Sequence, residues 1–455
     1  MIKELSILGF RGFGEKQTIE FALPDGKNDG SGLSIITGSN NSGKTTIVEA
    51  IRAFNGRTEP TFSEGRRNLQ NGGKVELSLL DSDDKECRIC SDPMGGSSTI
   101  RSGDIKKNKY YVLQSRRYVN YEFGRALVDR DYYIEEEMSI KPQRTANLEL
   151  FNNRLFQIEK NRDGFDCLLK RMLGEGFQWA IEQRDSGFYY IIYTYGGVSH
   201  SAEGIGDGIW SLFTICAALY DADDKTTLVI DEPELSLHPA LQKKLNKVLV
   251  EYAKKFQIII CTHSPYFVDW EAISHGAHFI RVIKEGVNSK CYQLHDDCRR
   301  VIKGALSNIN NPHILGIESS ELFFLDDGVI LVEGQEDVVI LNRISEEIGI
   351  SFRGSFFGWG AGGAERIQLF LELFRDLGYK KVVAIFDGDK KTEADKARSL
   401  FPQYHIITLR TDDVRDKKSR EIKEKQGITD EKGTIKREYY EYASDLIKEV
   451  NQNLI

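Results

Sequence analysis

Residues 38–45 read GSNNSGKT and place two glycines, a lysine and a threonine at fixed spacing. Glycine permits the backbone angles that turn amide groups toward an anion, and a helix starting here adds the positive end of its dipole. Lys44 can place its charge on the β and γ phosphates of a nucleotide, and Thr45 can offer its hydroxyl to Mg²⁺. We therefore predict that ATP binds with its phosphates on Gly38, Asn40, Asn41, Ser42, Gly43, Lys44, Thr45 and Thr46.

A second motif, LVIDEPELSLHP at residues 228–239, is an apolar run that ends in two adjacent acids. Asp231 is placed to hold magnesium, usually through water, and Glu232 to polarise an attacking water as general base. Acids often follow an apolar strand for purely structural reasons. Because the phosphate-binding loop lies upstream in the same chain, we favour the catalytic interpretation.

Two later apolar runs also end in acids, and their chemistry differs. Glu333 follows VILV and precedes a helix that carries Asp337, and Asp387 and Asp389 follow VVAIF. The carboxyl ends of parallel strands meet at one edge of a sheet, so the four acids can converge and would repel one another without a cation. Carboxylates without cysteine or histidine select hard ions, so Mg²⁺ or Mn²⁺ is expected. The alternative is a set of surface acids that cap helices.

The elements that must position these residues alternate between strands and helices. An antiparallel meander comes first, then a strand at 33–37, the glycine loop and a helix, with a further antiparallel sheet expected over 56–110. A second α/β block covers 226–282, and a third begins near residue 328. We predict an α/β protein with an ATPase domain at 1–315 and a smaller parallel α/β domain with a helical tail at 322–455. The helical stretch at 129–175 is either an insertion or a dimer-contact lobe.

Composition narrows the class of protein. The 455 residues are 40% hydrophobic, enough for at least one large core, and no apolar run reaches the roughly 18 to 20 residues that cross a bilayer. The start lacks the apolar core of a signal peptide, so a cytoplasmic protein without membrane contact is expected. Of the seven cysteines only Cys87 and Cys90 form a CxxC, and no second pair completes a zinc site. The net charge of −8 argues against a protein coated in nucleic acid but not against a local basic channel.

The motif DEPELSLHP, followed by IIICTHSPYFVD, resembles the ATPase head of the ABC/SMC-like superfamily. The resemblance implies that His263 senses the γ-phosphate and that residues 235–238 form a dimer-contacting loop. The segment 199–208, SHSAEGIGDG, occupies the place of the family's signature segment but departs from its LSGGQ form, and Ser201, Gly204 and Gly206 are candidates for the partner's nucleotide. Gln114 is a weak match to an expected glutamine. Two heads of a homodimer, or of a higher homo-oligomer, would then sandwich two nucleotides.

The third block resembles the Toprim domain, whose glutamate and paired aspartates support phosphodiester chemistry. A head joined to a C-terminal Toprim is similar to the OLD (overcoming lysogenisation defect) family of ATP-linked endonucleases. The resemblance implies a two-metal site with Glu333, Asp337, Asp387 and Asp389 as ligands, a nucleic-acid substrate and a role in defence against phage. Where the family often has a further glutamate, this chain has Arg415 beside Asp413 and Asp416. Either one of these aspartates replaces it, with Asp416 taken as the ligand, or the site is impaired for cleavage.

Two basic stretches are candidates for nucleic-acid contact. Residues 105–125 interleave Lys and Arg with tyrosines, although a sheet edge or nucleotide-side loop is an alternative, and residues 415–425 are basic beside the expected metal site. Our first hypothesis is an ATP-regulated, metal-dependent nuclease acting on DNA or RNA. The alternatives are a sensor or scaffold ATPase of a defence system, whose Toprim-like part binds a protein partner, and an SMC-like DNA-repair ATPase. The last is disfavoured because no long heptad-bearing coiled coil separates the nucleotide motifs.

Overall fold

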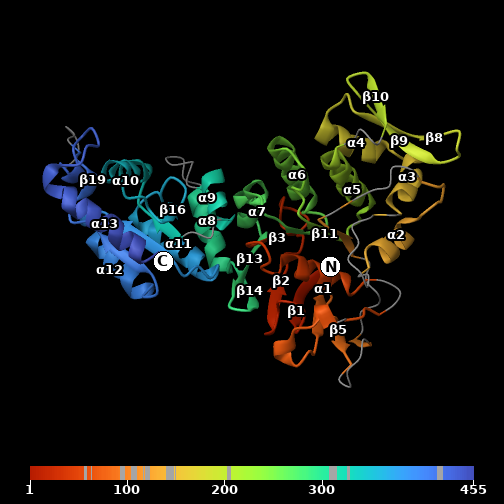
Figure 1. The fold of residues 1–455 in the computed structure, drawn as a ribbon, viewed down its shortest axis with the longest axis horizontal. Coiled ribbons are helices and arrows are strands. Elements are labelled where there is room, and N and C mark those ends of the chain that lie inside the picture. Colours follow the sequence, from red (N-terminus) through yellow and green to blue (C-terminus); the bar gives the residue numbers. More distant parts are fainter. Residues whose placement is uncertain are drawn as a thin grey trace. The chain divides into compact units, whose positions relative to one another are not determined.

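The computed structural model contains two compact units, Met1–Cys291 and Tyr292–Ile455 (Figure 1). It describes the chain except for residues 56–58, 63, 93–97, 104–109, 116, 118–122, 140–147, 149, 202–205, 307–314, 325–327, 418–423 and 455. The α/β architecture predicted from the sequence is confirmed. The sequence-based domain limits, 1–315 and 322–455, stay predictions.

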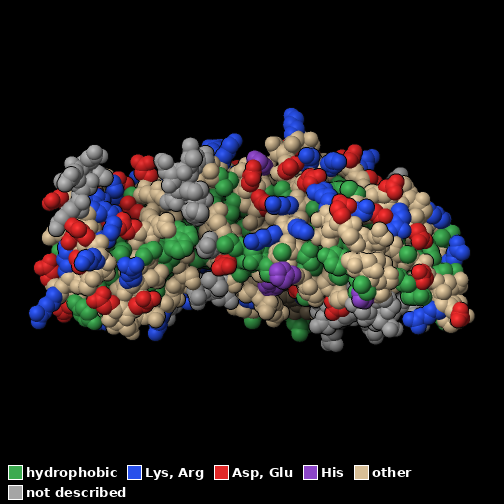
Figure 2. All heavy atoms as spheres, turned by 90° about the horizontal axis from the view of Figure 1, so that it is seen from above, with side chains coloured by type: hydrophobic (Ala, Val, Ile, Leu, Met, Phe, Trp, Pro, Cys, Tyr) green, Lys and Arg blue, Asp and Glu red, His purple; other side chains and the backbone are tan. Residues whose placement is uncertain are grey.

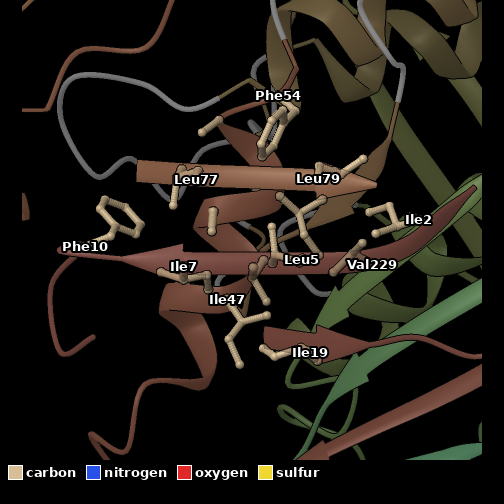
Figure 3. Packing of buried hydrophobic residues seen from close by; sticks show 14 of the residues in the cluster. Ile2, Leu5, Ile7, Phe10, Ile19, Ile47, Phe54, Leu77, Leu79 and Val229 are labelled. Carbon is tan, nitrogen blue, oxygen red and sulfur yellow. The ribbon is translucent and has the colours of Figure 1, made fainter. Parts of the chain in front are cut away.

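The first unit opens with a five-stranded antiparallel sheet in the order β2-β1-β4-β5-β6. Its strands are β1 (Ile2–Leu8), β2 (Gln17–Glu20), β4 (Glu76–Asp81), β5 (Glu86–Ser91) and β6 (Thr99–Gly103). Apolar side chains alternate along β1 and β4 and pack on helix α1 (Lys44–Arg52), so Leu5, Ile7, Leu77 and Ile47 point toward one another (Figure 3). This packing fixes the helix that begins at the end of the glycine loop.

A six-stranded sheet, in the order β14-β13-β3-β12-β11-β7, carries the first site. Strands β3 (Leu33–Thr37), β11 (Thr227–Asp231) and β12 (Gln257–Cys261) are buried at every position, as expected for parallel strands covered on both faces. Around them lie β7 (Tyr111–Leu113), β13 (His278–Glu285) and β14 (Asn288–Gln293). In register, Asp231 pairs with Cys261 and Cys261 with Ile36, so three strands end at the same level.

A mainly helical lobe with a small antiparallel sheet lies between β7 and β11 in the chain. It contains α2 (Arg130–Glu137), α3 (Phe151–Glu159), α4 (Asp163–Leu173), the sheet β10-β9-β8 and α5 (Asp207–Asp221). The sheet strands are β8 (Gln178–Gln183), β9 (Tyr189–Tyr195) and β10 (Val198–Ser201). Helix α6 (Pro239–Tyr252) follows β11, and the short α7 (Trp270–Ser274) follows β12.

The second unit contains a four-stranded parallel sheet in the order β16-β15-β17-β18. Its strands are β15 (Gly328–Leu331), β16 (Gly354–Phe356), β17 (Val382–Phe386) and β18 (His405–Thr408). Helices α10 (Gln335–Ile348) and α13 (Tyr440–Gln452) share one core with the sheet, whereas α11 (Ala364–Asp376) packs on β17 and α12 (Lys391–Leu400). Helices α8 (Asp296–Leu306) and α9 (Ile317–Glu321) and the pair β19 (Asp413–Arg415) and β20 (Gly427–Thr429) complete the unit.

None of the described helices combines the length and the apolar character that a membrane crossing requires. All seven cysteines are free thiols. Burial raises the pKa of both Cys87 and Cys90, which leaves them protonated at neutral pH. Among the described residues, no metal cluster includes either thiol.

Two candidate active sites

The first candidate site lies where β3, β11 and β12 end. The register of these strands brings the glycine loop, the acid pair and His263 to one edge of the sheet. A cavity of about 340 Å³ opens there. It is lined by Arg11, Gly12, Asn40, Asn41, Gly43, Lys44, Thr45, Thr46, Glu232, His263, Lys284 and Ser289. Residues predicted from separate motifs therefore line one cavity.

The glycine loop has the backbone that its sequence requires. Gly38 has a φ of +150°, and a Cβ there would lie 2.1 Å from the carbonyl oxygen of Val282. Gly43 has a φ of +122° and is the N-cap of helix α1, and the first turn of this helix lines the cavity. Lys44 Nζ donates to the carbonyl oxygens of Gly38 and Ser39, each at 2.9 Å. Burial lowers the pKa of Lys44, which favours an anionic partner for its ammonium group.

Asp231 is the buried acid at the end of β11. Apart from the nearby Thr45 hydroxyl, neither carboxylate oxygen has a hydrogen-bond partner among the described residues. Burial and the neighbouring charge of Glu232 raise its pKa to about 7, and the nearby Thr45 hydroxyl and the charges of Arg117 and Lys44 offset part of this rise. A buried carboxylate with open lone pairs beside a threonine hydroxyl fits a hard divalent cation.

Glu232 follows in an unusual backbone conformation. Its φ is +50°, the left-handed region that a residue with a side chain seldom adopts, and its N–H donates to the carbonyl oxygen of Cys261 at 2.7 Å. The side chain lines the cavity with His263. Burial, followed by the charge of Lys44, lowers the pKa of His263, so the imidazole is neutral at pH 7.

Glu234 is a residue that motif reading did not single out. Its carboxylate accepts from the Thr262 hydroxyl at 2.8 Å and from the backbone N–H of His263 at 2.6 Å. Burial raises its pKa. These bonds tie the loop after β11 to the exit of β12 and fix the position of His263. Nothing in the spacing DEPE distinguishes this role from solvent exposure.

The segment expected to reach a partner's nucleotide is described only in part. Ser201 ends β10, where its backbone pairs with Ile192; its side chain and the whole of Gly204 lie outside the described residues. Gly206 is the N-cap of α5. In the loop at 235–238, Leu235 is exposed and His238 Nδ1 caps α6 by accepting from Ala240 N–H at 3.2 Å. Gln114 follows β7, which pairs with β11.

The second candidate site lies at the ends of β15 and β17, which are parallel neighbours. Glu333 follows β15, and its Oε1 accepts from the backbone N–H of Asp387 at 3.0 Å. Asp337 lies in the first turn of α10, where its Oδ2 accepts from Gly334 N–H at 2.8 Å. The two strand ends that carry these acids therefore lie side by side, as we predicted from the sequence.

A compact group of three buried acids forms the centre of this edge. Asp337, Asp387 and Asp413 each offer a carboxylate oxygen, and these oxygens lie within 4.8 Å of one another. Burial, followed by the neighbouring acids, raises the pKa of Asp387 to about 9. Burial is also the main reason why the pKa of Glu333 rises to about 7 and that of Asp337 to about 6. Carboxylates that resist ionisation because they share a buried space fit a divalent cation.

Asp413, rather than Asp416, joins this group. Asp416 Oδ1 instead accepts from Gly427 N–H at 2.8 Å and from Lys436 Nζ at 2.6 Å. Both aspartates lie in the stretch RTDDVRD, and only the pairing of β19 with β20 decides which one turns inward. Sequence spacing could not make that distinction.

Cationic side chains also reach the acidic edge. Lys425 Nζ lies 2.8 Å from Asp389 Oδ2 and 3.5 Å from Asp413 Oδ2, and Lys417 Nζ lies 2.6 Å from Asp413 Oδ2. Arg415 and Lys417 pair with Glu336. Asp389 is thus engaged with a lysine, beside the group of three acids.

The basic stretch at 105–125 differs from a nucleic-acid surface in its described part. Tyr110, Tyr111 and Arg117 are buried, so they cannot stack on bases or reach phosphates, and residues 105–109, 116 and 118–122 lie outside the described residues. Arg125 lies over the ring of Phe156. On the face that Figure 2 displays, acidic and basic side chains are intermixed.

Comparison with known families agrees with both sites. Two AAA models match, "AAA domain" at residues 4–183 and "AAA domain, putative AbiEii toxin, Type IV TA system" at residues 143–269. The model "Overcoming lysogenization defect protein-like, TOPRIM domain" matches residues 324–389. The chain therefore contains segments that match AAA ATPase domains and a segment that matches an OLD-like Toprim domain. The resemblance proposed from its motifs is confirmed.

Proteins similar to this chain include nucleases. An OLD nuclease of Thermus scotoductus is 24% identical over 413 residues, which cover 77% of this chain and 75% of the relative. The Septu protein PtuA of Bacillus thuringiensis is 25% identical over 60% of this chain and 74% of its own. The Old nuclease of Escherichia phage P2 is 29% identical over 27% of this chain and 20% of its own.

Solved SMC heads are similar at low scores. The SMC head domain from Thermotoga maritima is 14% identical with a TM-score of 0.37, over 65% of this chain and 99% of that chain. A Smc head from Pyrococcus furiosus, bound to the C-terminal domain of ScpA, is 15% identical with a TM-score of 0.42, over 68% and 99%.

Proposed function

We propose that this chain hydrolyses ATP at the first site and cleaves phosphodiester bonds of DNA or RNA at the second, with a divalent cation at each. The observation that carries the nuclease assignment is the group formed by Asp337, Asp387 and Asp413, three buried carboxylates at a strand edge of a Toprim-like unit. The OLD nuclease relative supports the same reaction. A role in defence against phage rests on the resemblance to OLD proteins and to Septu protein PtuA.

At the nucleotide site, each residue has a distinct task. Magnesium would neutralise charge on the β and γ phosphates, with Thr45 and Asp231 as the residues that hold it. Lys44 would exchange its bonds with the loop carbonyls for phosphate oxygens. Glu232 would take a proton from the attacking water onto its carboxylate, and His263 would donate a hydrogen bond to the γ-phosphate.

At the second site, Mg²⁺ or Mn²⁺ would supply Lewis acidity and a more acidic bound water. Asp337, Asp387 and Asp413 are the residues that would hold the cation, with Glu333 oriented by the backbone N–H of Asp387. Binding there would release protons from carboxyls whose pKa is raised. The ammonium groups of Lys417 and Lys425 form ion pairs with Asp413 and Asp389. We propose that these lysines take part of the place of a second metal ion.

The same lysines favour one alternative function. Lysine side chains already neutralise part of the charge of the acidic cluster, so the cluster need not bind a metal. The chain would then be a sensor or scaffold ATPase whose Toprim-like unit binds a protein partner of the same defence system. A repair ATPase of the SMC kind is not favoured, because the longest helix among the described residues, α5, has 15 residues. Homodimers formed through the heads are part of the proposal in either case.

A nuclease assay separates these functions. Purified protein with Mg²⁺ or Mn²⁺ should cleave some DNA or RNA, and the double variant Asp387→Ala with Asp389→Ala should lose cleavage while it hydrolyses ATP at the wild-type rate. Lys44→Ala should lose ATP hydrolysis. If the double variant cleaves like the wild type, the acidic edge is not the nuclease site; if the wild type cleaves nothing, the scaffold alternative replaces the proposal.

A further inference from the structure

Arg117 is a buried arginine that neither motif includes. It follows β7 and is 7% exposed. Its Nη1 donates to the carbonyl oxygens of Gln114 at 2.6 Å and Asp231 at 2.9 Å. Its Nη2 donates to the carbonyl oxygen of Glu232 at 3.1 Å and to the Ser211 hydroxyl at 2.7 Å. One guanidinium group therefore connects three segments that are far apart in sequence.

The group acts on the backbone of the acid pair and leaves its carboxylates open. Burial lowers the pKa of Arg117 to about 10, which still leaves it charged at neutral pH, and Asp231 is the largest of the nearby charges that favour the cation. Burying an arginine costs desolvation free energy, and a residue that only connected loops would not need a buried charge. Its planar fork suits carbonyl acceptors at fixed angles, which the spherical ammonium of lysine does not reproduce.

The second acceptor, Glu232, is the residue whose backbone is strained. A φ of +50° on a glutamate costs of order 1 kcal/mol and persists only where neighbours hold it. Three hydrogen bonds hold it here: its N–H donates to Cys261, and its carbonyl oxygen accepts from Arg117 and from Leu235 N–H, each at 3.1 Å. Without the bond from Arg117, only the Leu235 N–H of the same loop holds the Glu232 carbonyl, and we expect the carboxylate to shift relative to the cavity.

Ser211 connects Arg117, and through it the acid pair, to helix α5. The segment 199–208, which we propose to reach the partner's nucleotide, runs into this helix, whose first residue is Asp207. Its first turn also touches the loop after Glu232, since a Cβ on Gly208 would lie 2.4 Å from the carbonyl oxygen of Ser236. A shift of α5 would therefore reach the acid pair through Ser211 and Arg117.

We infer that Arg117 is a positioning residue for ATP hydrolysis: it holds Glu232 in its strained conformation and couples the placement of that general base to helix α5. The inference rests on the proposed role of Glu232 in ATP hydrolysis. It assigns Arg117 no contact with nucleotide. Its loss should therefore reduce turnover and leave the affinity for ATP unchanged.

The test uses the full chain and compares four variants by kcat, KM and the Kd for ATP. Ser211→Ala removes the hydroxyl that Arg117 contacts and should lower kcat about 3- to 10-fold, the worth of one hydrogen bond. Arg117→Lys keeps the charge without the fork and should lower kcat about 10- to 100-fold, as small displacements of a catalytic group do. The Kd for ATP should stay within about 2-fold of the wild-type value in both variants, because neither substitution removes a contact with the bound nucleotide.

Thr214→Ala is the matched control. Thr214 lies one turn along the same helix, is equally buried, and its hydroxyl donates to the Ser211 carbonyl rather than to Arg117. The Thr214→Ala variant should lose as much melting temperature as Ser211→Ala does, but its kcat should equal that of the wild type. Equal kcat for Ser211→Ala and Thr214→Ala, with full turnover in Arg117→Lys, would overturn the inference. Full turnover in Glu232→Gln would instead overturn the proposed role of Glu232, so the two failures are distinguishable.

Discussion

At the residue scale, Asp387 combines burial with close acidic neighbours. Its pKa is about 9 in the folded chain, against an ordinary value of 3.8. Between about pH 4 and pH 9 the unfolded chain ionises this group while the folded chain keeps its proton. The contribution of Asp387 to the free energy of unfolding therefore falls as pH rises through this window, and below pH 4 it is constant.

This sign gives a testable stability profile. Asp387→Asn cannot ionise, so with EDTA present we expect it to melt above the wild type at pH 8–9 and to lose that advantage toward pH 4–5. Mn²⁺ should raise the melting temperature of the wild type more at pH 8.5 than at pH 6, since fewer protons must leave, and should not raise that of the variant through this site. Thermal melts over a range of pH would measure both effects. If the difference in melting temperature between the variant and the wild type is the same at every pH, the assignment is contradicted.

Lys425 is the residue that competes with a cation. It pairs with Asp389 and Asp413, so Lys425→Ala should free carboxylate oxygens and bind Mn²⁺ about 2- to 5-fold more tightly, the range of a partly exposed ion pair. Lys448→Ala, which breaks only the exposed pair with Asp445, is the control of equal size. Calorimetric titration reports both affinities. Weaker Mn²⁺ binding in Lys425→Ala would show that the lysine supports the site instead.

Residue types at fixed spacing made much of both sites predictable. The glycine loop, Asp231, Glu232 and His263 line or adjoin one cavity, and Glu333, Asp337 and Asp387 lie at one sheet edge. The sequence offered both Asp413 and Asp416 as a further ligand and could not choose between them. Glu234 and Arg117 were not predictable as site residues, because their roles come from tertiary contacts that sequence spacing does not encode.

At the element scale, strand register decides which acids meet. Parallel pairing of β3, β12 and β11 sets three strand ends level, and β15 pairs with β17 in the second unit in the same way. These buried apolar strands were predictable from their composition. The pairing of β19 with β20 was not, since each has three residues and no periodic pattern. That short pair decides between Asp413 and Asp416.

A glycine contact holds the end of β15. Gly360 has a φ of +86°, and a Cβ there would lie 2.6 Å from the carbonyl carbon of Gly334. In the same loop, the N–H groups of Gly362 and Gly363 both donate to the carbonyl oxygen of Glu333 at 2.8 Å. Gly360→Ala should lower the melting temperature and nucleic-acid cleavage while ATP hydrolysis persists. The change should cost more than the roughly 1 kcal/mol of left-handed strain alone.

Gly349→Ala isolates that strain. Gly349 has a φ of +75° with open space around the added methyl, so it carries the backbone cost without the close contact. We expect Gly349→Ala to retain cleavage. If Gly360→Ala and Gly349→Ala lose stability equally and both retain cleavage, the loop does not position Glu333.

At the scale of the whole molecule, the chain joins two kinds of phosphate chemistry. The first unit offers a buried lysine and amides to a nucleotide, and the second offers buried acids to a cation. A net charge of −8 leaves nucleic-acid contact to local basic groups such as those near Lys417 and Lys425.

The most direct measurement follows ATP hydrolysis and nucleic-acid cleavage in the same sample, with Mn²⁺ or EDTA, for wild type, Asp337→Asn and Lys44→Ala. We predict that the wild type shows both activities only with metal. Asp337→Asn should hydrolyse ATP at the wild-type rate and lose at least about 100-fold in cleavage, and Lys44→Ala should lose ATP hydrolysis. Wild-type cleavage by Asp337→Asn, or cleavage that persists in EDTA, would contradict the assignment of a metal-dependent nuclease to the acidic edge.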